Sequence, residues 1–125
     1  MADVLFITAP LTKITKGIIN LKVMKLMNKG SIVINLSRPG CLKLKDLIYL
    51  LKIKHLGGAG LDVVEGEPLK KNNILFKFNN VVVTPHTGGI SDNYDSRHIK
   101  LILKNIKQFI NNRPLNNIVN TKKEY

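Results

Sequence analysis

Four chemically capable side chains in this sequence stand at or just after runs of apolar residues. Arg38 follows the run "SIVINL", Asp62 lies near the end of "GGAGLDVV" with Glu67 shortly after it, and His86 follows "NVVVTP". An arginine can bind a carboxylate through two parallel hydrogen bonds, and a histidine can move a proton near neutral pH. An acidic neighbour can hold the imidazole ring and raise its pKa. These residue types suit acid/base chemistry on an anionic substrate.

Each of these residues also has an ordinary structural explanation. His86 fits a surface or loop histidine, and Arg38 beside Pro39 fits a solvated turn residue. Glu67 beside Pro68 fits a loop carboxylate, and an Asp after a strand often hydrogen-bonds the following turn. Spacing alone therefore leaves both the chemical and the structural interpretation open.

The other ionisable candidates are better explained without chemistry. His55 precedes Gly57 at the end of a helical pattern, where a positive charge interacts favourably with the helix dipole. His98 lies within a long helical pattern and is expected on its surface. Cys41 has no histidine beside it in the sequence to activate its thiol, so we expect it to be passive.

The elements that must position these residues follow a regular alternation. Continuous apolar runs predict strands over residues 4–8, 31–36, 57–64 and 80–85, of the kind buried on both faces of a parallel sheet. Helical patterns lie between the first three strands. One covers residues 20–30, with Asn20 as N-cap and Gly30 at its end. The other covers residues 42–57 and has one apolar face, formed by Leu44, Leu47, Ile48 and Leu51. This order predicts an α/β fold of βαβ units.

In such a sheet the carboxyl ends of the strands meet at one edge, where ligands bind. Arg38, Asp62, Glu67 and His86 are therefore expected at that edge. Residues 65–79 predict a long irregular loop with one short turn, and loops of that length are usually functional or disordered. The chain then predicts a long helix capped by Ser91 or Asp92, with an apolar stripe that includes Ile99, Ile102, Leu103, Ile106, Phe109 and Ile110.

Length and composition restrict the class of protein. A chain of 125 residues supports one core and one domain. No apolar run approaches the roughly 20 residues of a membrane span, and the N-terminus lacks the pattern of a secretory signal. One cysteine permits no internal disulfide, which favours a cytoplasmic location. We expect no metal site and no membrane contact.

The formal net charge of +12 raises the question of nucleic-acid binding. Nearly all of that charge is lysine scattered along the chain, there is no Trp, and aromatic residues make up 6%. The chain therefore has few aromatic side chains on which bases could stack and few arginines that could recognise guanine. We expect no nucleic-acid partner.

Four ordered motifs, "ADVLFITAPLT", "MNKGSIVINLSRPG", "LGGAGLDVVEGEPL" and "NVVVTPHTGG", resemble the D-isomer-specific 2-hydroxyacid dehydrogenases, which include phosphoglycerate, glyoxylate and D-lactate dehydrogenases. The resemblance covers almost the whole chain. It implies an oxidoreductase that transfers a hydride between NAD and a 2-hydroxy or 2-keto acid, with NADP not excluded. It also implies that Arg38 binds the substrate, that His86 is the general acid/base, and that Glu67 pairs with His86 and tunes its pKa. The nicotinamide side of the cofactor would be lined by Ala9, Leu36, Ser37, Arg38, Asp62, His86, Gly88 and Gly89.

The sequence departs from the family pattern in several places. It lacks the first βαβ unit, whose Gly-rich turn receives the pyrophosphate, and Met1 falls in mid-domain. Pro39 stands where the family usually has Gly after the arginine, and "CLKLKDL" lacks the acidic residue that commonly starts the next helix. We therefore expect residues 1–112 to be the C-terminal half of a Rossmann-type NAD-binding domain, a partial doubly wound parallel sheet with a long C-terminal helix, and residues 113–125 to be a tail.

Such a truncated chain is expected to require the missing N-terminal half or a homo-oligomer for activity. Three other hypotheses stay open from the sequence. The first is an inactive remnant or one subunit of a split enzyme, and the second is a non-catalytic module that uses the fold and the long helix for association. A basic nucleic-acid binder is the remaining alternative, and it would show steep salt dependence.

Overall fold

The computed structural model describes residues 2–125, and the chain divides into two compact units. The first unit ends at Gly88 and the second runs from Gly89 to Tyr125. The domain boundary predicted from the sequence lies after residue 112 instead. That boundary concerns membership of the cofactor-binding domain, and it stays a prediction. The expected α/β class with a parallel sheet and a long C-terminal helix is confirmed.

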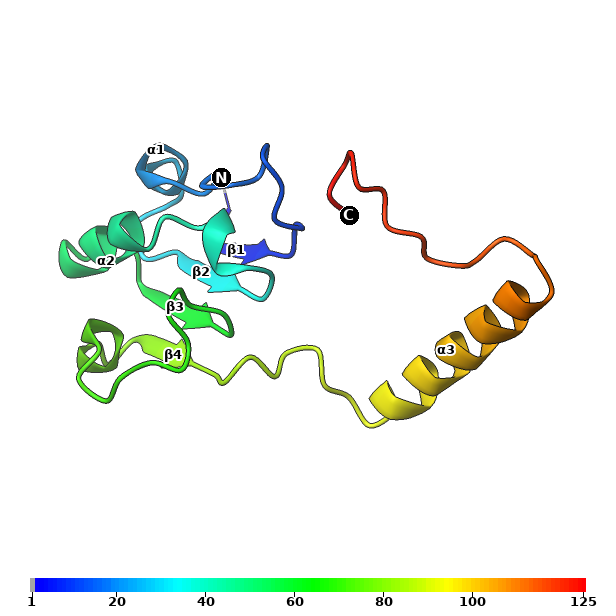
Figure 1. Ribbon diagram of the computed structural model, residues 1–125. Coiled ribbons are helices and arrows are strands. Elements are labelled where there is room, and N and C mark those ends of the chain that lie inside the picture. Colours follow the sequence, from blue (N-terminus) through cyan, green and yellow to red (C-terminus); the bar gives the residue numbers. More distant parts are fainter. Residues whose placement is uncertain (1) are drawn as a thin grey trace. The chain divides into compact units, whose positions relative to one another are not determined.

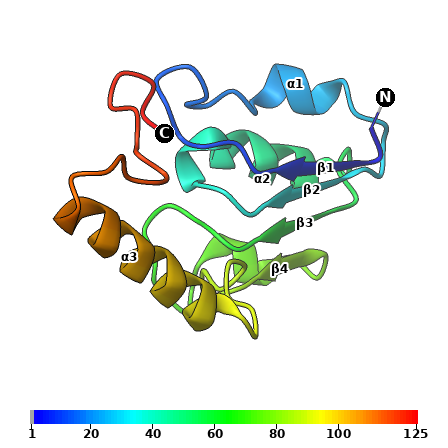
Figure 2. The same ribbon diagram turned by 90° about the vertical axis from the view of Figure 1, so that its right-hand side faces the viewer.

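A four-stranded parallel sheet in the order β1-β2-β3-β4 forms the first unit (Figures 1 and 2). Its strands are β1 (Val4–Ile7), β2 (Ile32–Asn35), β3 (Gly58–Leu61) and β4 (Val81–Val83). All four predicted strands are present, each one to four residues shorter than expected. The ladder pairs Ile7 with Asn35, Asn35 with Leu61, and Leu61 with Val83. The carboxyl ends of the strands therefore lie in register along one edge.

Two helices connect the first three strands. Helix α1 (Leu21–Lys25) begins as expected at Asn20, whose side-chain oxygen accepts a hydrogen bond from the Val23 amide. It ends at Lys25 and not at Gly30, because Leu26 already bonds back to the Val23 carbonyl in a tighter turn. Helix α2 (Leu44–Lys52) follows a short 3₁₀ helix, Pro39–Cys41. The predicted irregular loop contains a 3₁₀ helix at Ile74–Lys77.

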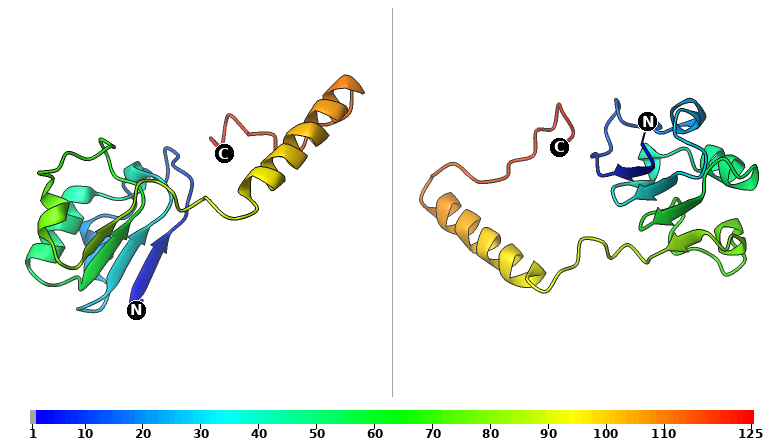
Figure 3. Two further views of the ribbon diagram at one scale, coloured as in Figure 1. Left: turned by 90° about the horizontal axis from the view of Figure 1, so that it is seen from below. Right: turned by 180° about the vertical axis from the view of Figure 1, so that it is seen from behind.

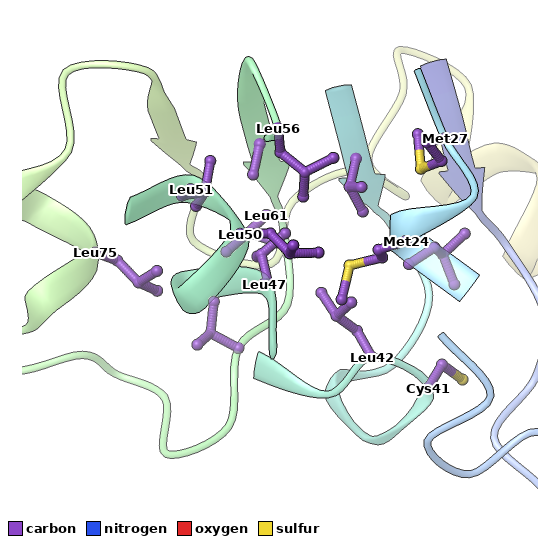
Figure 4. Close-up of a cluster of buried hydrophobic side chains, with 14 residues drawn as sticks. Met24, Met27, Cys41, Leu42, Leu47, Leu50, Leu51, Leu56, Leu61 and Leu75 are labelled. Carbon is purple, nitrogen blue, oxygen red and sulfur yellow. The ribbon is translucent and has the colours of Figure 1, made fainter. Parts of the chain in front are cut away.

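The hydrophobic core lies between the sheet and these helices. Met24 of α1, Leu47 and Leu50 of α2, and Leu61 of β3 have exposed fractions of 0, 0, 0 and 2% (Figure 4). Leu75 of the 3₁₀ helix Ile74–Lys77 belongs to the same cluster. Burial of this one side of the sheet fixes the register of each strand, because a one-residue slip would turn its inward side chains outward.

The opposite face of the sheet, here called the open face, exposes apolar side chains. Val4, Phe6, Ile32 and Val82 are 44, 58, 40 and 65% exposed. Register places them together, since Val4 pairs with Ile32 and Val82 pairs with Gly60, the neighbour of Ile34. Figure 3 shows β1, β2, β3 and β4 side by side in the sheet. The expectation that the strands are buried on both faces is therefore wrong for the described residues.

The second unit consists of α3 (Tyr94–Ile110) and the segment that follows it. Asn93 is its N-cap, so the prediction of Ser91 or Asp92 is wrong, and the Asn93 side chain makes no capping hydrogen bond. Asn105 of α3 fixes the following segment: its side-chain amide donates to the Asn116 carbonyl, and its oxygen accepts from the Asn116 amide. The predicted apolar stripe is present on α3, and no residue of this helix is buried.

No helix within residues 2–125 combines the length and the apolar character needed to cross a bilayer.

Candidate active site

The candidate residues follow the carboxyl ends of three neighbouring strands. Arg38 comes three residues after β2, Asp62 follows β3 directly, and His86 comes three residues after β4. Glu67 lies in the loop after β3. Because these strands are parallel and in register, the segments that carry the four residues leave the same edge of the sheet.

Glu67 and His86 form a direct pair. The Nδ1 atom of His86 lies 3.1 Å from Oε2 of Glu67, with 51% of the His86 side chain and 32% of the Glu67 side chain exposed. The other oxygen of Glu67 accepts a hydrogen bond from the Val64 amide, so the carboxylate is anchored to the segment that follows β3. A proton on Nδ1 that is donated to Glu67 leaves Nε2 as the ring nitrogen that exchanges a proton with a substrate. The pair has the arrangement of a general acid/base oriented by a carboxylate.

Asp62 is buried, with 4% of its surface exposed, and it is bonded to the segment around His86. Its Oδ1 accepts from the Thr84 hydroxyl at 2.6 Å and from the Thr87 amide at 2.9 Å, and its Oδ2 accepts from the Gly88 amide at 2.8 Å. The Thr84 hydroxyl, followed by the two amides and the charge of His86, holds the pKa of Asp62 below its ordinary value of 3.8, although burial acts in the opposite direction. Asp62 is therefore ionised at neutral pH.

The backbone at His86 is unusual. Its φ of +56° lies in the left-handed region, which non-glycine residues adopt at a cost of about 1 kcal/mol or more. At Gly88 a Cβ atom would lie 2.8 Å from Oδ2 of Asp62, closer than real Cβ contacts. The turn from His86 to Gly88 thus requires a bend at the histidine and no side chain at the glycine.

Asn35 is a buried residue of the site that the sequence patterns did not indicate. It is 1% exposed, and its oxygen accepts hydrogen bonds from both the amide and the hydroxyl of Ser37, each at 3.1 Å. Its side-chain amide donates to the Arg38 carbonyl at 3.2 Å. Asn35 therefore shapes the turn that carries Arg38. The available signal was a buried polar residue at the end of an otherwise apolar strand.

Arg38 itself is exposed, and its guanidinium donates to the Ser37 carbonyl at 2.8 Å. Within the part of the chain that the structure describes, its side chain is bonded only within its own loop and not to Glu67 or His86. Pro39 opens the 3₁₀ helix after it, so the missing amide hydrogen falls at a position where a helix does not need one.

The residues that the family resemblance assigns to the cofactor lie in different surroundings. Leu36 is 46% exposed beside the Arg38 loop, whereas Ser37 is buried and bonded to Asn35. The Ala9 carbonyl lies 3.7 Å from the Cys41 sulfur. Gly88 ends the first unit and Gly89 begins the second, so the structure brings Gly88 to Asp62 but does not place Gly89 relative to the site.

An apolar cavity of about 350 Å³ lies beside Glu67. Its lining consists of Glu67, Pro68, Leu69, Phe76, Val83, Thr84 and Pro85. Such apolar surroundings with few polar groups are typical of small-molecule sites.

The residues that we expected to be passive occupy structural positions. Cys41 is fully buried in the core. His98 is exposed on α3, where its Nδ1 lies 3.1 Å from the Tyr94 carbonyl. His55 follows α2, and its Nε2 is buried without a hydrogen-bond partner among the described residues. Its interaction with the helix dipole stays a prediction.

The His86–Glu67 pair lies beyond the carboxyl edge of a parallel α/β sheet, and the sequence comparisons identify the family. Residues 1–88 match the family model described as D-isomer specific 2-hydroxyacid dehydrogenase, NAD binding domain. The chain belongs to this family. The expected family, fold and cofactor class are thereby confirmed.

Similar proteins include several reductases of 2-oxo acids. The chain is 40% identical to the glyoxylate/hydroxypyruvate reductase HPR3 of Arabidopsis thaliana, over 90% of this chain and 35% of that protein. It is also 40% identical to the glyoxylate reductase of Pyrococcus horikoshii, over 86% of this chain and 32% of that protein. The chain thus spans about a third of the length of these relatives.

Solved structures of the same family are also similar to this chain. A D-isomer specific 2-hydroxyacid dehydrogenase from Xanthobacter autotrophicus, in complex with NADPH and MES, matches 99% of this chain and 50% of its own, with a TM-score of 0.90 and 30% identity. The NADPH-dependent glyoxylate/hydroxypyruvate reductase of Sinorhizobium meliloti, in complex with NADP and sulfate, matches 98% of this chain and 40% of its own, with a TM-score of 0.88 and 31% identity.

Proposed function

We propose that this chain supplies the proton-transfer and carboxylate-binding groups of an NAD(P)-dependent D-2-hydroxyacid dehydrogenase, which interconverts a 2-hydroxy acid and a 2-oxo acid. The observation that carries this proposal is the 3.1 Å contact between His86 and Glu67 at the carboxyl edge of the sheet. The relatives named for glyoxylate and hydroxypyruvate indicate small 2-oxo acids as the substrate class. We place the protein in the cytoplasm, because its one cysteine is buried and free.

Each catalytic group has a defined task in this proposal. His86, protonated on both ring nitrogens, gives its Nε2 proton to the carbonyl oxygen during reduction and takes it back during oxidation. Glu67 holds the Nδ1–H and stabilises the imidazolium. Arg38 leaves the Ser37 carbonyl and binds the substrate carboxylate through two hydrogen bonds.

The residues present fit the nicotinamide end of the cofactor. NAD(P)H, when bound, supplies the hydride for reduction. Leu36 offers an exposed apolar side chain, and a Cβ built on Gly88 would lie 3.7 Å from it, so the absence of a side chain keeps this surface flat and open. Following the family resemblance, we assign the nicotinamide side to residues of the first unit, namely Ala9, Leu36, Ser37, Arg38, Asp62, His86 and Gly88. Which of NAD and NADP is preferred depends on ribose contacts outside this set.

A complementing polypeptide completes the site in this proposal, on the same chain or on a second one. Two observations support it: the chain spans 35 and 32% of two relatives, and the open face exposes 58% of Phe6 and 65% of Val82. An apolar sheet face normally packs against another layer. The complementing segment would cover this face and bind the pyrophosphate. The alternative occupant of the open face is a second copy of this chain in a homo-oligomer.

The test is a complementation assay. The full chain is co-expressed with the part of the Pyrococcus horikoshii glyoxylate reductase that it does not match, and oxidation of NADH and NADPH is followed with glyoxylate and hydroxypyruvate. We expect turnover from the complemented protein and little from the chain alone. His86→Gln should lower kcat by about 10²- to 10⁴-fold, the range typical of general acid/base groups.

His98→Gln is the matched control, because this exposed histidine lies on α3 and, in the described part of the chain, its hydrogen bond is to the Tyr94 carbonyl of the same helix. It should leave turnover unchanged. Arg38→Gln should raise the KM for the 2-oxo acid. Equal activity of the His86→Gln and His98→Gln proteins would contradict the proposal, as would the absence of turnover from a complemented protein that binds cofactor.

A further inference from the structure

The hydrogen bonds of Asp62 are concentrated on one short segment of chain. Its backbone directly follows β3, and its amide donates to the Asn35 carbonyl at 3.0 Å. Among residues 2–125, the donors to its side chain are Thr84, Thr87 and Gly88. The carboxylate thus joins the end of one strand to the turn that follows the next.

These donors stand on both sides of His86 in the sequence. Thr84 precedes the histidine by two residues, whereas Thr87 and Gly88 follow it. One carboxylate therefore clamps the backbone before and after His86. Within this clamp His86 takes its φ of +56°, and the Thr87 and Gly88 amides point to the same anion. Successive amides that converge on an anion are a known consequence of a left-handed residue in a turn.

We infer that Asp62 is a positioning residue that holds His86 in its left-handed conformation and within hydrogen-bond reach of Glu67. This inference goes beyond the proposed function, in which Asp62 lines the cofactor side of the site. It rests on that function only for its effect on turnover. The lowered pKa of Asp62 agrees with it, because the donors favour the ionised form.

Replacement of Asp62 by Asn would break the clamp with little change of volume. The amide group keeps one acceptor oxygen, but its NH₂ group must face either the Gly88 amide or the pair formed by the Thr84 hydroxyl and the Thr87 amide. A donor would then oppose a donor in a buried position, which is unfavourable. The turn is expected to relax, and His86 to leave the left-handed region and its contact with Glu67.

The experiment uses the full chain with isotope labels for NMR and needs neither cofactor nor turnover. In the unsubstituted chain, the His86 ring should show nuclear Overhauser contacts with the Glu67 side chain, and the Thr87 and Gly88 amides should exchange slowly with solvent. Asp62→Asn should remove those contacts and speed both exchanges by about tenfold or more. The amides of β2 should stay within about twofold.

Asp46→Asn is the matched control, since the Asp46 carboxylate accepts from the Leu21 amide at 2.8 Å, outside this turn. It should leave the His86–Glu67 contacts intact. Thr84→Val is the second variant, because it removes one donor and keeps the Asp62 charge. It should raise the exchange of the Thr87 amide severalfold. The inference would be overturned if folded Asp62→Asn kept the His86–Glu67 contacts. If Asp62→Asn does not fold, the deciding variant is Thr84→Val. Intact His86–Glu67 contacts and unchanged exchange of the Thr87 amide in that variant would overturn the inference.

A kinetic readout separates this inference from the proposed function. In the complemented enzyme, Asp62→Asn should lower kcat by about tenfold or more while the KM for glyoxylate changes less than about twofold, since Arg38 lies in another loop. A complemented protein that lacks activity, together with the NMR changes described above, would refute the proposed function and leave the positioning role standing. A fall in activity with unchanged NMR contacts would overturn the positioning role instead.

Discussion

At the scale of single residues, the turns of the site depend on buried polar side chains that bond to the backbone and to neighbouring hydroxyl groups. Asn35 holds the turn of Arg38, and Asp62 holds the turn of His86. Both side chains are at least 96% buried, so each lost hydrogen bond would leave a desolvated group without a partner. Substitutions at these positions are therefore expected to change the conformation of the loops more than the core.

Gly88→Ala tests the tightest approach in the site. Its new Cβ would lie 2.8 Å from Oδ2 and 3.2 Å from Cγ of Asp62, which has little room to move because it is buried. We expect the free energy of unfolding of the first unit to fall by about 1–3 kcal/mol, as overpacking does elsewhere. Denaturant titration would measure this change in the free energy of unfolding.

Gly89→Ala is the neighbouring control. A Cβ at Gly89 meets nothing within 4 Å, and its φ is not in the left-handed region. Its effect should be neutral or stabilising by up to about 1 kcal/mol, because alanine restricts the unfolded chain. Equal losses in the two variants would show that Gly88 has no special steric requirement.

The ionised state of Asp62 makes stability depend on pH. Its pKa is lower in the folded chain than its ordinary value of 3.8, so the unfolded chain binds this proton more readily. The stabilisation is fully present above the unfolded value and is lost as the pH falls through the folded value. The difference in unfolding free energy between the unsubstituted chain and Asp62→Asn should therefore be constant above about pH 5 and shrink steadily below about pH 4. A constant difference down to about pH 2 would contradict this assignment.

At the scale of elements, the strands were predicted well and the helix ends less well. The short apolar runs bounded by turn residues indicated the positions of all four strands, although one face of these strands is exposed. The end of α1 depends on a local change from α to 3₁₀ bonding at Leu26, which leaves no distinct residue type in the sequence. Gly30 was a plausible stop signal, but the helix had already ended five residues before it.

The candidate site shows the same limit. Spacing alone placed Arg38, Asp62, Glu67 and His86 at one edge, and only the family resemblance suggested that Glu67 and His86 form a pair. The contacts of Asn35 with Ser37 and of Asp62 with Thr84 could not be predicted, because they depend on the backbone path of the turns. Short polar side chains bond to nearby backbone in many alternative ways, and the sequence does not select one.

Asn20→Ala tests the N-terminus of α1. The Asn20 oxygen accepts from the Val23 amide at 3.2 Å, whereas its amide group donates weakly to the Gly17 and Ile18 carbonyls at 3.4 and 3.3 Å. Loss of the cap should lower the free energy of unfolding by about 1 kcal/mol. Asn20→Asp keeps the acceptor and loses the donors, so it should cost less than about half of that. Equal losses would show that the donated bonds, and not the cap, stabilise this helix.

At the scale of the whole molecule, charge and apolar surface call for different explanations. The net charge of +12 comes from lysines spread along the chain, and it acts on anions at long range without specifying one. The open face is local and specific, because register brings Val4 and Ile32 together on one surface and sets Phe6 on that surface beside them. Specific association is therefore expected to depend on the open face and only its rate on the charge.

Phe6→Lys tests whether the open face receives the complementing polypeptide. Phe6 is 58% exposed, so the substitution should change the stability of the first unit little, yet it places a charge where an apolar layer would pack. We expect the Kd for the complementing Pyrococcus horikoshii segment, measured by calorimetry, to rise at least about tenfold. Ile14→Lys, at a position that is 87% exposed and outside the sheet, should leave the Kd unchanged. Loss of self-association in Phe6→Lys, with binding of the segment intact, would identify a second copy of this chain as the occupant of the open face and contradict the heterologous partner.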